Sequence, residues 1–404
     1  VHRPAAEWEL SSLLADASRR SSPVTVVGGG TKTGVGKPAA AGAATISMAS
    51  FKGIPLYEPS ELVMSCLAGT PLSEIEALLT QRGQMLAFEP IDVGPALGKP
   101  ARAGSIGAVF ATNLSGARRI AAGAARDNLL GLKAVTGSGE AFKSGGRVMK
   151  NVTGYDLARA FTGSWGTLAV ATEVTFKVLP RPESSASLVI FGLPDEIAVE
   201  MMTTALGTPY EVSGTVHLPL EMAKRLRSAN LKSIGKAVTA VRLEGFHRFL
   251  PARIEKLKAI LAPLGDVHVL AHELSAPLWA ELNELSVVTG VPSPLWRLSV
   301  PPLQGPKVVA AIAKHMPVEA FYDWSGGLVW LLVPGAADAG ASDIRRIIAR
   351  TQGHATLIRA DESVRRAVEV FQPLDAGLDR ITRAIKATFD PAGILDPGRM
   401  YASM

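Results

Sequence analysis

The sequence predicts an α+β protein with two unlike regions and a C-terminal segment that folds back onto the first region. Glycines punctuate short apolar runs in the first region, most densely between Gly104 and Val178. From residue 184 to about 358, apolar strand-like segments alternate with helical ones, which is typical of a second α+β layer. The chain closes on DPAGILDPGRMYASM, a proline and glycine turn cluster that favours packing over a frayed end. We therefore divide the chain into residues 1–182, 183–358 and 359–404.

Composition and charge indicate a globular protein and argue against nucleic-acid binding. The 404 residues are 47% hydrophobic and 19% charged, so the chain can bury substantial cores. The net charge is +6, but the lysines and arginines are scattered, without a basic run and without interleaved aromatic residues. We expect only weak attraction to anionic ligands, partners or membrane surfaces.

Cysteine content and hydropathy restrict the cofactors and the compartment. Cys66 is the only cysteine, so the chain alone can form no internal disulfide and cannot ligate an iron–sulfur cluster or a thiolate zinc site. No apolar run reaches the ~18 residues of a transmembrane helix, and the first residues do not read as a signal peptide. We expect a cytoplasmic protein, with peripheral association at the inner membrane left open.

The segment 24–34 is the first candidate for a phosphate contact. A helical pattern covers residues 7–20, and the apolar strand VTVV then runs into the loop GGGTKTG. A dinucleotide GxGxxG motif needs glycine where the chain has Thr33, and a Walker loop fails at Thr31 and Pro38. What remains is a strand followed by a loop whose backbone N–H groups can hold a pyrophosphate.

The rest of the first region predicts short elements joined by glycine turns. Thr70 is a candidate N-cap for a helix that Gly83 closes, with Pro71 in the first helical position. Such small elements let the backbone come close to a large ligand. The other expected elements are a short helix at 105–113, a hairpin over 126–146 that turns at 137–139, a short helix within 154–166, and a strand over 167–180.

The second region reads as an antiparallel sheet with helices on one side, followed by a helical tail. The expected strands are SLVIFGL, TVHLPL, AVTAVRLEGF, VHVLA, WRLSV, EAFYDW and LVWLLV. The expected helices include DEIAVEMMTTAL, LPARIEKLKAILAPL and PLWAELNELSVVTG. His268 and His272 have i,i+4 spacing, but a strand passing into a loop is expected there, so no metal site is predicted.

Four motifs follow one another along the first region, and their order matters as much as their residues. They are Gly28-Gly29-Gly30-Thr31 after a strand, Gly104-Ser105-Ile106-Gly107 with Ala111-Thr112-Asn113, Arg126-Asp127-Asn128, and Gly154-Tyr155-Asp156-Leu157 with Gly166-Thr167-Leu168. Together with the tail FDPAGILDPGR, they resemble the flavin-binding family named after vanillyl-alcohol oxidase and para-cresol methylhydroxylase (PCMH). The family's terminal motif usually has asparagine where this chain has Asp396. The resemblance implies a two-subdomain PCMH-type FAD-binding domain, an α+β cap domain with an antiparallel sheet, and a C-terminal segment that returns to the FAD domain.

Further local features are the run KNVTGYDLARAFTGSWGTL, the run Gly116-Ala117-Arg118-Arg119, and Asp323-Trp324 with Gly326-Gly327. In these the chain is similar to the FAD-binding E subunits of bacterial glycolate oxidases. That resemblance implies an FAD-dependent oxidoreductase subunit that takes part in flavin electron transfer, in a complex that oxidises glycolate or another small D-2-hydroxy acid to the 2-oxo acid. The implied partners are a homologous flavoprotein D subunit and an iron–sulfur F subunit.

Two alternatives stay open at this point. The first is a self-sufficient FAD-dependent oxidase or dehydrogenase that acts on a small 2-hydroxy acid or alcohol. The second is a cofactor-free structural subunit that keeps the fold only for assembly. NAD as the electron acceptor is disfavoured, because no second nucleotide motif is found.

The resemblance places FAD on the backbone and small polar groups of the first region. Residues 28–33 would cradle the pyrophosphate, residues 104–113 would line the phosphate and flavin side, and Asp396 or Arg399 would approach the isoalloxazine. Gly154, Gly166 and the backbone near Val170 would hold ribose and adenine. The complete set of predicted FAD contacts is Val27, Gly28, Gly29, Gly30, Thr31, Lys32, Thr33, Pro90, Gly104, Ser105, Gly107, Ala108, Thr112, Asn113, Gly116, Gly154, Tyr155, Gly163, Gly166, Val170, Asp396 and Arg399.

The chain also departs from its relatives. Members that attach FAD covalently use a histidine or cysteine near the flavin; the loops here offer neither, so noncovalent FAD is predicted. Trp165 stands where many relatives have glutamate. The metal-binding His-x-Gly-Asp-Gly-x-x-His run of 2-hydroxy-acid oxidisers is absent, and its nearest counterpart, residues 321–327, has no histidine. Arg297 is the predicted anchor for a substrate carboxylate, while Asp323 and His354 are only candidates for a base.

Overall fold

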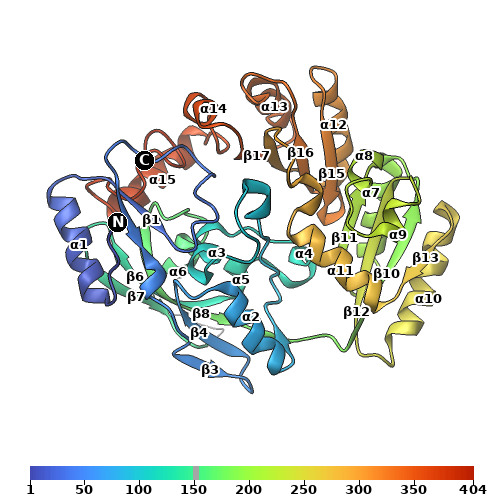
Figure 1. The fold of residues 1–404 in the computed structure, drawn as a ribbon, viewed down its shortest axis with the longest axis horizontal. Helices are drawn as coiled ribbons and strands as arrows, with labels where there is room; N and C mark the ends of the chain where they lie inside the picture. The colour runs from blue at the N-terminus through green and yellow to red at the C-terminus, as the bar shows by residue number, and fades with distance from the viewer. Residues whose placement is uncertain (149–153) are drawn as a thin grey trace.

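A computed structural model describes residues 1–148 and 154–404 and builds the protein around two antiparallel sheets (Figure 1). The blue to green segments form most of a five-stranded sheet at one end of the molecule, and the green to orange segments form an eight-stranded sheet at the other. Residues 150–153, within the KNVTGYDLARAFTGSWGTL run, lie outside the described residues. No helix of the described part is both long and apolar enough to cross a membrane.

The five-stranded sheet confirms the hairpin expected over residues 126–146 and the strand expected over 167–180. Val135 pairs with Ala141 beside the predicted turn at 137–139. The strand over residues 169–177, which comes next in the chain, lies in the centre of the sheet. Phe110 and Phe176 pack 5.5 Å apart, between ring centroids, in the core beneath it. In spatial order the strands are β3 (Leu56–Glu58), β4 (Val63–Leu67), β8 (Ala169–Lys177), β6 (Leu129–Thr136) and β7 (Ala141–Gly145).

Short helices and a parallel strand pair surround this sheet. The helix predicted at 7–20 is confirmed, and so are the strand at 24–27 and the short helix after Ser105. The predicted cap of the helix after Pro71 is wrong: the Thr70 hydroxyl donates to the Leu67 carbonyl, 2.7 Å away, and Pro71 itself precedes the helix. These elements are α1 (Glu7–Arg19), β1 (Val24–Val27), β2 (Ala44–Ser47), α2 (Leu72–Gln81), β5 (Gln84–Met85), α3 (Ile106–Thr112), α4 (Arg119–Ala122), α5 (Ala125–Asn128), α6 (Leu157–Phe161) and β9 (Leu179–Pro180).

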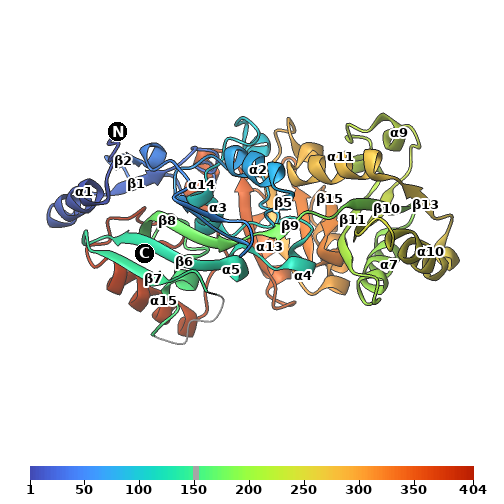
Figure 2. The ribbon, with the colours of Figure 1, turned by 90° about the horizontal axis from the view of Figure 1, so that it is seen from below.

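The C-terminal segment returns to the first region, as predicted. The Val24 N–H donates to the Ile394 carbonyl over 2.8 Å, so the tail adds to the edge of β1. Helix α15 (Ala376–Phe389) lies beneath β6 and β7 in Figure 2, preceded by α14 (Glu362–Ala367). The buried Lys386 ammonium donates to the Thr167 carbonyl at 2.7 Å and to the Asp390 carboxylate at 2.6 Å. The hydrogen bond to Thr167 ties the tail to the segment just before β8.

The eight-stranded sheet also confirms the strands expected in the second region. The sequence analysis missed one strand, β17, at the sheet's edge. In spatial order the strands are β13 (His268–Leu270), β10 (Ser184–Phe191), β12 (Val238–Gly245), β11 (Val212–Leu218), β15 (Glu319–Asp323), β16 (Leu328–Leu332), β14 (Leu295–Ser299) and β17 (His354–Arg359). The chain reaches this sheet between β9 and β10; the boundary at 182 stays a prediction.

Helices cover both faces of the larger sheet, so the prediction of one covered side is wrong. Figure 2 shows α11 (His272–Asn283) on one side of the strands and α7 (Asp195–Leu206) with α10 (Leu250–Leu261) on the other. Side chains of β10 alternate accordingly: Ser187 accepts a hydrogen bond from the Trp279 indole at 2.8 Å, whereas Leu188 packs in the cluster beneath α10. His272 begins α11 rather than lying in a loop. The other helices are α8 (Leu220–Ala223), α9 (Ala229–Lys232), α12 (Gly305–Ala313) and α13 (Ala341–Ile348).

A buried charged cluster joins the two regions. Glu89 and Arg118 come from the first region, and Arg242 and Glu244 come from β12. Arg242 Nη1 lies 2.9 Å from Glu89 Oε1, and Arg118 Nη2 lies 3.0 Å from Glu244 Oε1. Burial alone would raise the pKa of Glu89, but the charges of Arg242 and Arg118 outweigh burial and lower it to about 2. The four side chains balance one another, and we call them the paired cluster.

Candidate FAD site

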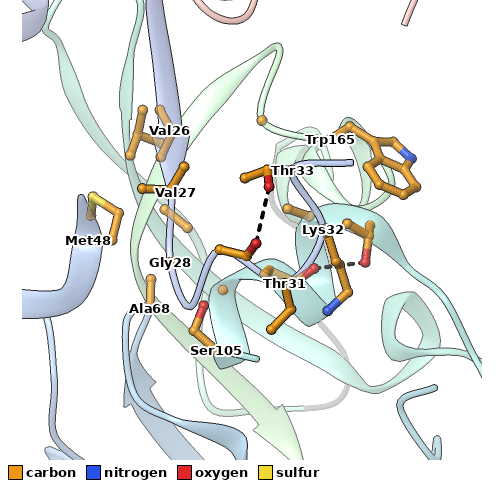
Figure 3. A pocket seen from close by; sticks show the side chains of 18 of the residues that line it. Val26, Val27, Gly28, Thr31, Lys32, Thr33, Met48, Ala68, Ser105 and Trp165 are labelled. Atoms are coloured by element: carbon orange, nitrogen blue, oxygen red, sulfur yellow. Dashed lines mark hydrogen bonds between the residues drawn. The ribbon is translucent and has the colours of Figure 1, made fainter. Parts of the chain in front are cut away.

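A cavity lies where the loop after β1 meets α3 and the start of β8 (Figure 3). In that view Met48 and Ala68 stand at one end and Trp165 at the other. The lining residues that the sequence analysis predicted are Val27, Gly28, Gly30, Thr31, Lys32, Thr33, Ser105, Gly107, Ala108, Thr112, Gly166, Val170 and Arg399. Segments far apart in the sequence therefore meet at one site.

The loop from Gly28 to Thr33 presents backbone rather than side chains. A Cβ on Gly28 would lie 2.0 Å from Ser105 Oγ, and one on Gly29 would lie 1.8 Å from the Ala103 carbonyl oxygen, so larger residues do not fit. Within the described residues, the N–H groups of residues 29–33 donate no hydrogen bond. Free donors on a closely packed loop suit an anionic group such as a diphosphate.

Ser105 and Gly107 complete this face of the cavity. Ser105 is 2% exposed, and its hydroxyl has no hydrogen-bond partner in the described structure although it borders the cavity. A buried polar atom without a partner indicates a position for a missing ligand. A Cβ on Gly107 would come within 2.8 Å of the Ala68 carbonyl oxygen, so a glycine at this position lets α3 lie close to the end of β4. The residues present therefore fit a large polyanionic cofactor.

Two cationic side chains border the cavity. Lys32 is 8% exposed and forms no ion pair among the described residues; burial lowers the pKa of its ammonium group, and nearby Asp92 partly offsets this effect. Arg399 pairs with Asp396 over 3.1 Å and donates to the Lys32 carbonyl over 3.3 Å. The Arg399 guanidinium also lies 5.7 Å from the centre of the Trp165 ring. Both cations can attract a phosphate or an electron-rich ring.

Several predicted contacts lie beside the cavity rather than in its wall. Gly104 is adjacent, since a Cβ there would lie 3.5 Å from Lys32 Nζ. Asp396 Oδ2 would lie 3.7 Å from a Cβ on Gly166. Gly29 packs on Ala103 as described above. Asn113 ends α3, and the Gly163 N–H donates to the Phe110 carbonyl at the same end of that helix.

The remaining predicted contacts lie elsewhere. The Pro90 carbonyl accepts a hydrogen bond from Asn283 of α11, and a Cβ on Gly116 would collide with Asn283 Oδ1 at 2.5 Å. Both positions serve the junction between the two regions. Gly154 is exposed, and Tyr155 is 91% exposed at the surface. Their predicted contact with ribose and adenine remains a prediction.

Sequence reasoning missed much of the apolar lining. The missed residues are small or apolar: Val26, Met48, Ala68, Ala111, Phe161, Ala169 and Ala171. Ala111 could have been found, because it lies one helical turn from Ala108 on α3. Met48 follows β2 and carries no local signal. Apolar walls are typical of ligand sites whose few polar groups set orientation.

Arg297, the predicted substrate anchor, is not part of this cavity. It lies on β14, on the sheet face that also carries Asp323, because Arg297 pairs with Trp330 and Trp330 pairs with Phe321. Asp323 is buried, and burial raises the pKa of its carboxyl to about 7, although it accepts a hydrogen bond from the Trp324 N–H at 2.6 Å. Among the described residues there is no group of three His, Cys, Asp or Glu that could hold a metal ion.

Comparisons with known proteins agree with this geometry. Residues 1–145 match the family described as FAD binding domain. The chain is 33% identical over 388 residues to glycolate oxidase subunit GlcE of Escherichia coli K12, covering 95% of this chain and 94% of that protein. It is 24% identical to glycolate oxidase subunit GlcD of Bacillus subtilis, covering 98% of this chain and 87% of that protein.

The fold has solved counterparts. A crystal structure of p-cresol methylhydroxylase with substrate bound matches 100% of this chain and 89% of its own with a TM-score of 0.76, at 15% sequence identity. That likeness confirms the predicted PCMH-type fold. The FAD-binding match over the first region does not favour a cofactor-free structural subunit. The chain is an FAD-binding oxidoreductase and belongs to the family of glycolate oxidase subunit GlcE.

Proposed function

We propose that this chain is the FAD-holding E-type subunit of a glycolate oxidase complex, which converts glycolate or another small D-2-hydroxy acid to the 2-oxo acid. The observation that carries the proposal is the match to GlcE over 95% of the chain, which spans both sheets as well as the FAD cavity. A match restricted to the cofactor region would have supported FAD binding alone.

The proposed cofactor contacts follow from the cavity. The N–H groups of residues 29–33 and the Ser105 hydroxyl would hold the diphosphate, and Lys32 would balance part of its charge. Arg399 and Trp165 would border the opposite end, where the tail closes the cavity. Bound FAD would accept two electrons from a substrate.

We further propose that FAD is held noncovalently. The described residues that line the cavity include no histidine or cysteine. Cys66 is buried in β4, where burial raises the pKa of its thiol, so it is a poor nucleophile. A visible spectrum taken before and after acid precipitation should show the yellow flavin leave with the supernatant.

The partner subunits are part of the same proposal. A single cysteine cannot ligate an iron–sulfur cluster, so electrons that reach FAD in this chain need another carrier. A homologous flavoprotein D subunit and an iron–sulfur F subunit would supply the second flavin and that carrier. A cytoplasmic location, with peripheral association at the inner membrane, stays a prediction.

Expression of the chain alone and together with its D-type and F-type partners tests the function. We expect glycolate-dependent reduction of an artificial acceptor by the assembled complex and little by the single chain. A Gly28→Val variant is the matched control, because its side chain would collide with Ser105 and displace FAD. Brisk turnover by the single chain would instead support the self-sufficient alternative, and a complex inert towards glycolate would contradict the proposed substrate.

A further inference from the structure

Arg297 is a buried cation that forms no ion pair with a carboxylate of the described residues. Its side chain is 8% exposed, and its Nε atom has no hydrogen-bond partner among those residues. Burial, together with the neighbouring charge of Arg119, lowers the pKa of Arg297 to about 10, and the nearby Asp323 offsets only part of this effect. Because an unpaired buried charge is costly, such a residue is expected where a ligand supplies the missing partner.

Arg119 lies at the same place but comes from the other region. Its Cζ atom is 4.8 Å from the centre of the Trp324 ring, and the Cζ of Arg297 is 5.0 Å from that centre. Trp324 is fixed in turn, because its indole N–H donates to the Gly116 carbonyl over 2.9 Å. Like Arg297, Arg119 forms no ion pair with a carboxylate of the described residues. The guanidinium groups of Arg119 and Arg297 therefore both contact the indole ring of Trp324.

The segment that joins α3 to α4 places Arg119 and Arg297 relative to the FAD cavity. Residues Ala108 and Thr112 of α3 line the cavity, and the same segment continues past Asn113 to Gly116, which holds Trp324. Arg119 then begins α4. The two arginines therefore stand at the junction between the first region and the eight-stranded sheet.

We propose that Arg119 and Arg297 bind the carboxylate of a small 2-hydroxy acid beside Trp324. The inference rests on the proposed function for the choice of acid, but the anion site itself rests on the two unpaired guanidinium groups. Arginine grips a carboxylate through paired N–H donors, and two arginines from different regions would close around one anion. Asp323 lies on the same sheet face yet does not pair with Arg297, which leaves the cation available.

Tryptophan fluorescence of the FAD-loaded chain, titrated with glycolate, tests the proposal. We expect saturable quenching that disappears in Trp324→Phe, which would localise the signal. Arg297→Met and Arg119→Met should each weaken glycolate binding by about tenfold or more, whereas Arg102→Met, which removes an exposed arginine paired with Glu76, should not change it. Two separate variants keep the test valid if one of them fails to fold.

Turnover by the reconstituted complex separates the two proposals. A raised KM for glycolate in both Met variants, with FAD content unchanged, supports the anion site. An unchanged KM and unchanged quenching in both variants would overturn the anion site while leaving the proposed function standing. A wild-type complex that binds glycolate at this site without oxidising it would instead contradict the proposed function alone.

Discussion

Arg118 and Arg119 are neighbours in the sequence but occupy opposite electrostatic situations. Arg118 belongs to the paired cluster, where Glu89 and Glu244 meet two arginines. Arg119 shares an indole with Arg297 and meets no carboxylate in the described structure. We call Arg119 and Arg297 the open cluster. The comparison shows that two adjacent arginines at one junction can differ in kind: one joins the two regions, and the other is left for the anion that we propose, because different groups face them.

The largest contrast is expected from the same substitution made in each cluster. Arg242→Met would leave Arg118 alone to balance two buried carboxylates, Glu89 and Glu244, and should cost about 3–5 kcal/mol of unfolding free energy. Arg297→Met removes a buried charge that has no ion-pair partner, so the unfolding free energy should stay unchanged or rise. Urea denaturation of both variants measures the difference. Equal losses would erase the distinction between the clusters.

The pH dependence of the unfolding free energy should differ between Asp323, which lies near the open cluster, and Glu89, which belongs to the paired cluster. The folded-state pKa of Asp323, about 7, lies above its unfolded value, so the folded protein binds this proton more tightly. Its contribution is therefore present below pH 4 and is lost as the pH rises towards 7. This decline in unfolding free energy should be on the order of a few kcal/mol, in line with the shift in pKa, and Asp323→Asn should remove it. A parallel stability profile for variant and wild type would refute the assignment.

Glu89 should behave in the opposite sense. Its folded-state pKa, about 2, lies below the unfolded value, so its stabilising effect is present at neutral pH and is lost as the pH falls from about 4.5 towards 2. Acid titration of unfolding in the Asp323→Asn background isolates this second slope. Stability that stays constant down to pH 2 would mean that the paired cluster does not hold the junction.

The smallest effect is expected at an exposed ion pair of the first region. Arg102 and Glu76 have 61% and 32% of their side-chain surfaces exposed. Glu76→Gln should lower the unfolding free energy by no more than about 1 kcal/mol, and added salt should abolish the difference. Denaturation at low and high ionic strength makes this measurement. A loss as large as that of Arg242→Met would show that burial is not what distinguishes the clusters.

The two regions also differ in how far the sequence predicted them. The loop at residues 28–33 was predictable because its signal is local: three glycines follow an apolar strand. Gly28 leaves room for Ser105, Gly29 leaves room for the Ala103 backbone, and Gly30 has a positive φ. Tyr155 was predicted as a contact from a family motif, but a motif does not tell whether a side chain is buried, and Tyr155 lies at the surface. Apolar lining residues such as Met48 were missed because any core would use them.

The charged clusters were not predictable in the same way. Glu89 and Arg242 are far apart in the sequence, and only strand pairing decides that they meet while Arg297 stays unpaired. One signal was overlooked: Leu188, Val189 and Ile190 form an unbroken apolar run in β10, and all three are buried. A continuous apolar run in a strand indicates that both faces of the sheet are covered.

The central claim is that the free backbone N–H groups of residues 29–33 hold the diphosphate of FAD. Calorimetric titration of the FAD-free chain with FAD and with riboflavin, which lacks the diphosphate and the adenosine attached to it, tests this claim most directly when Gly28→Val is titrated alongside. The account predicts that FAD binds about a hundredfold or more tightly than riboflavin, and that Gly28→Val abolishes this preference. Equal affinity for the two ligands, or an unchanged preference in Gly28→Val, would contradict it.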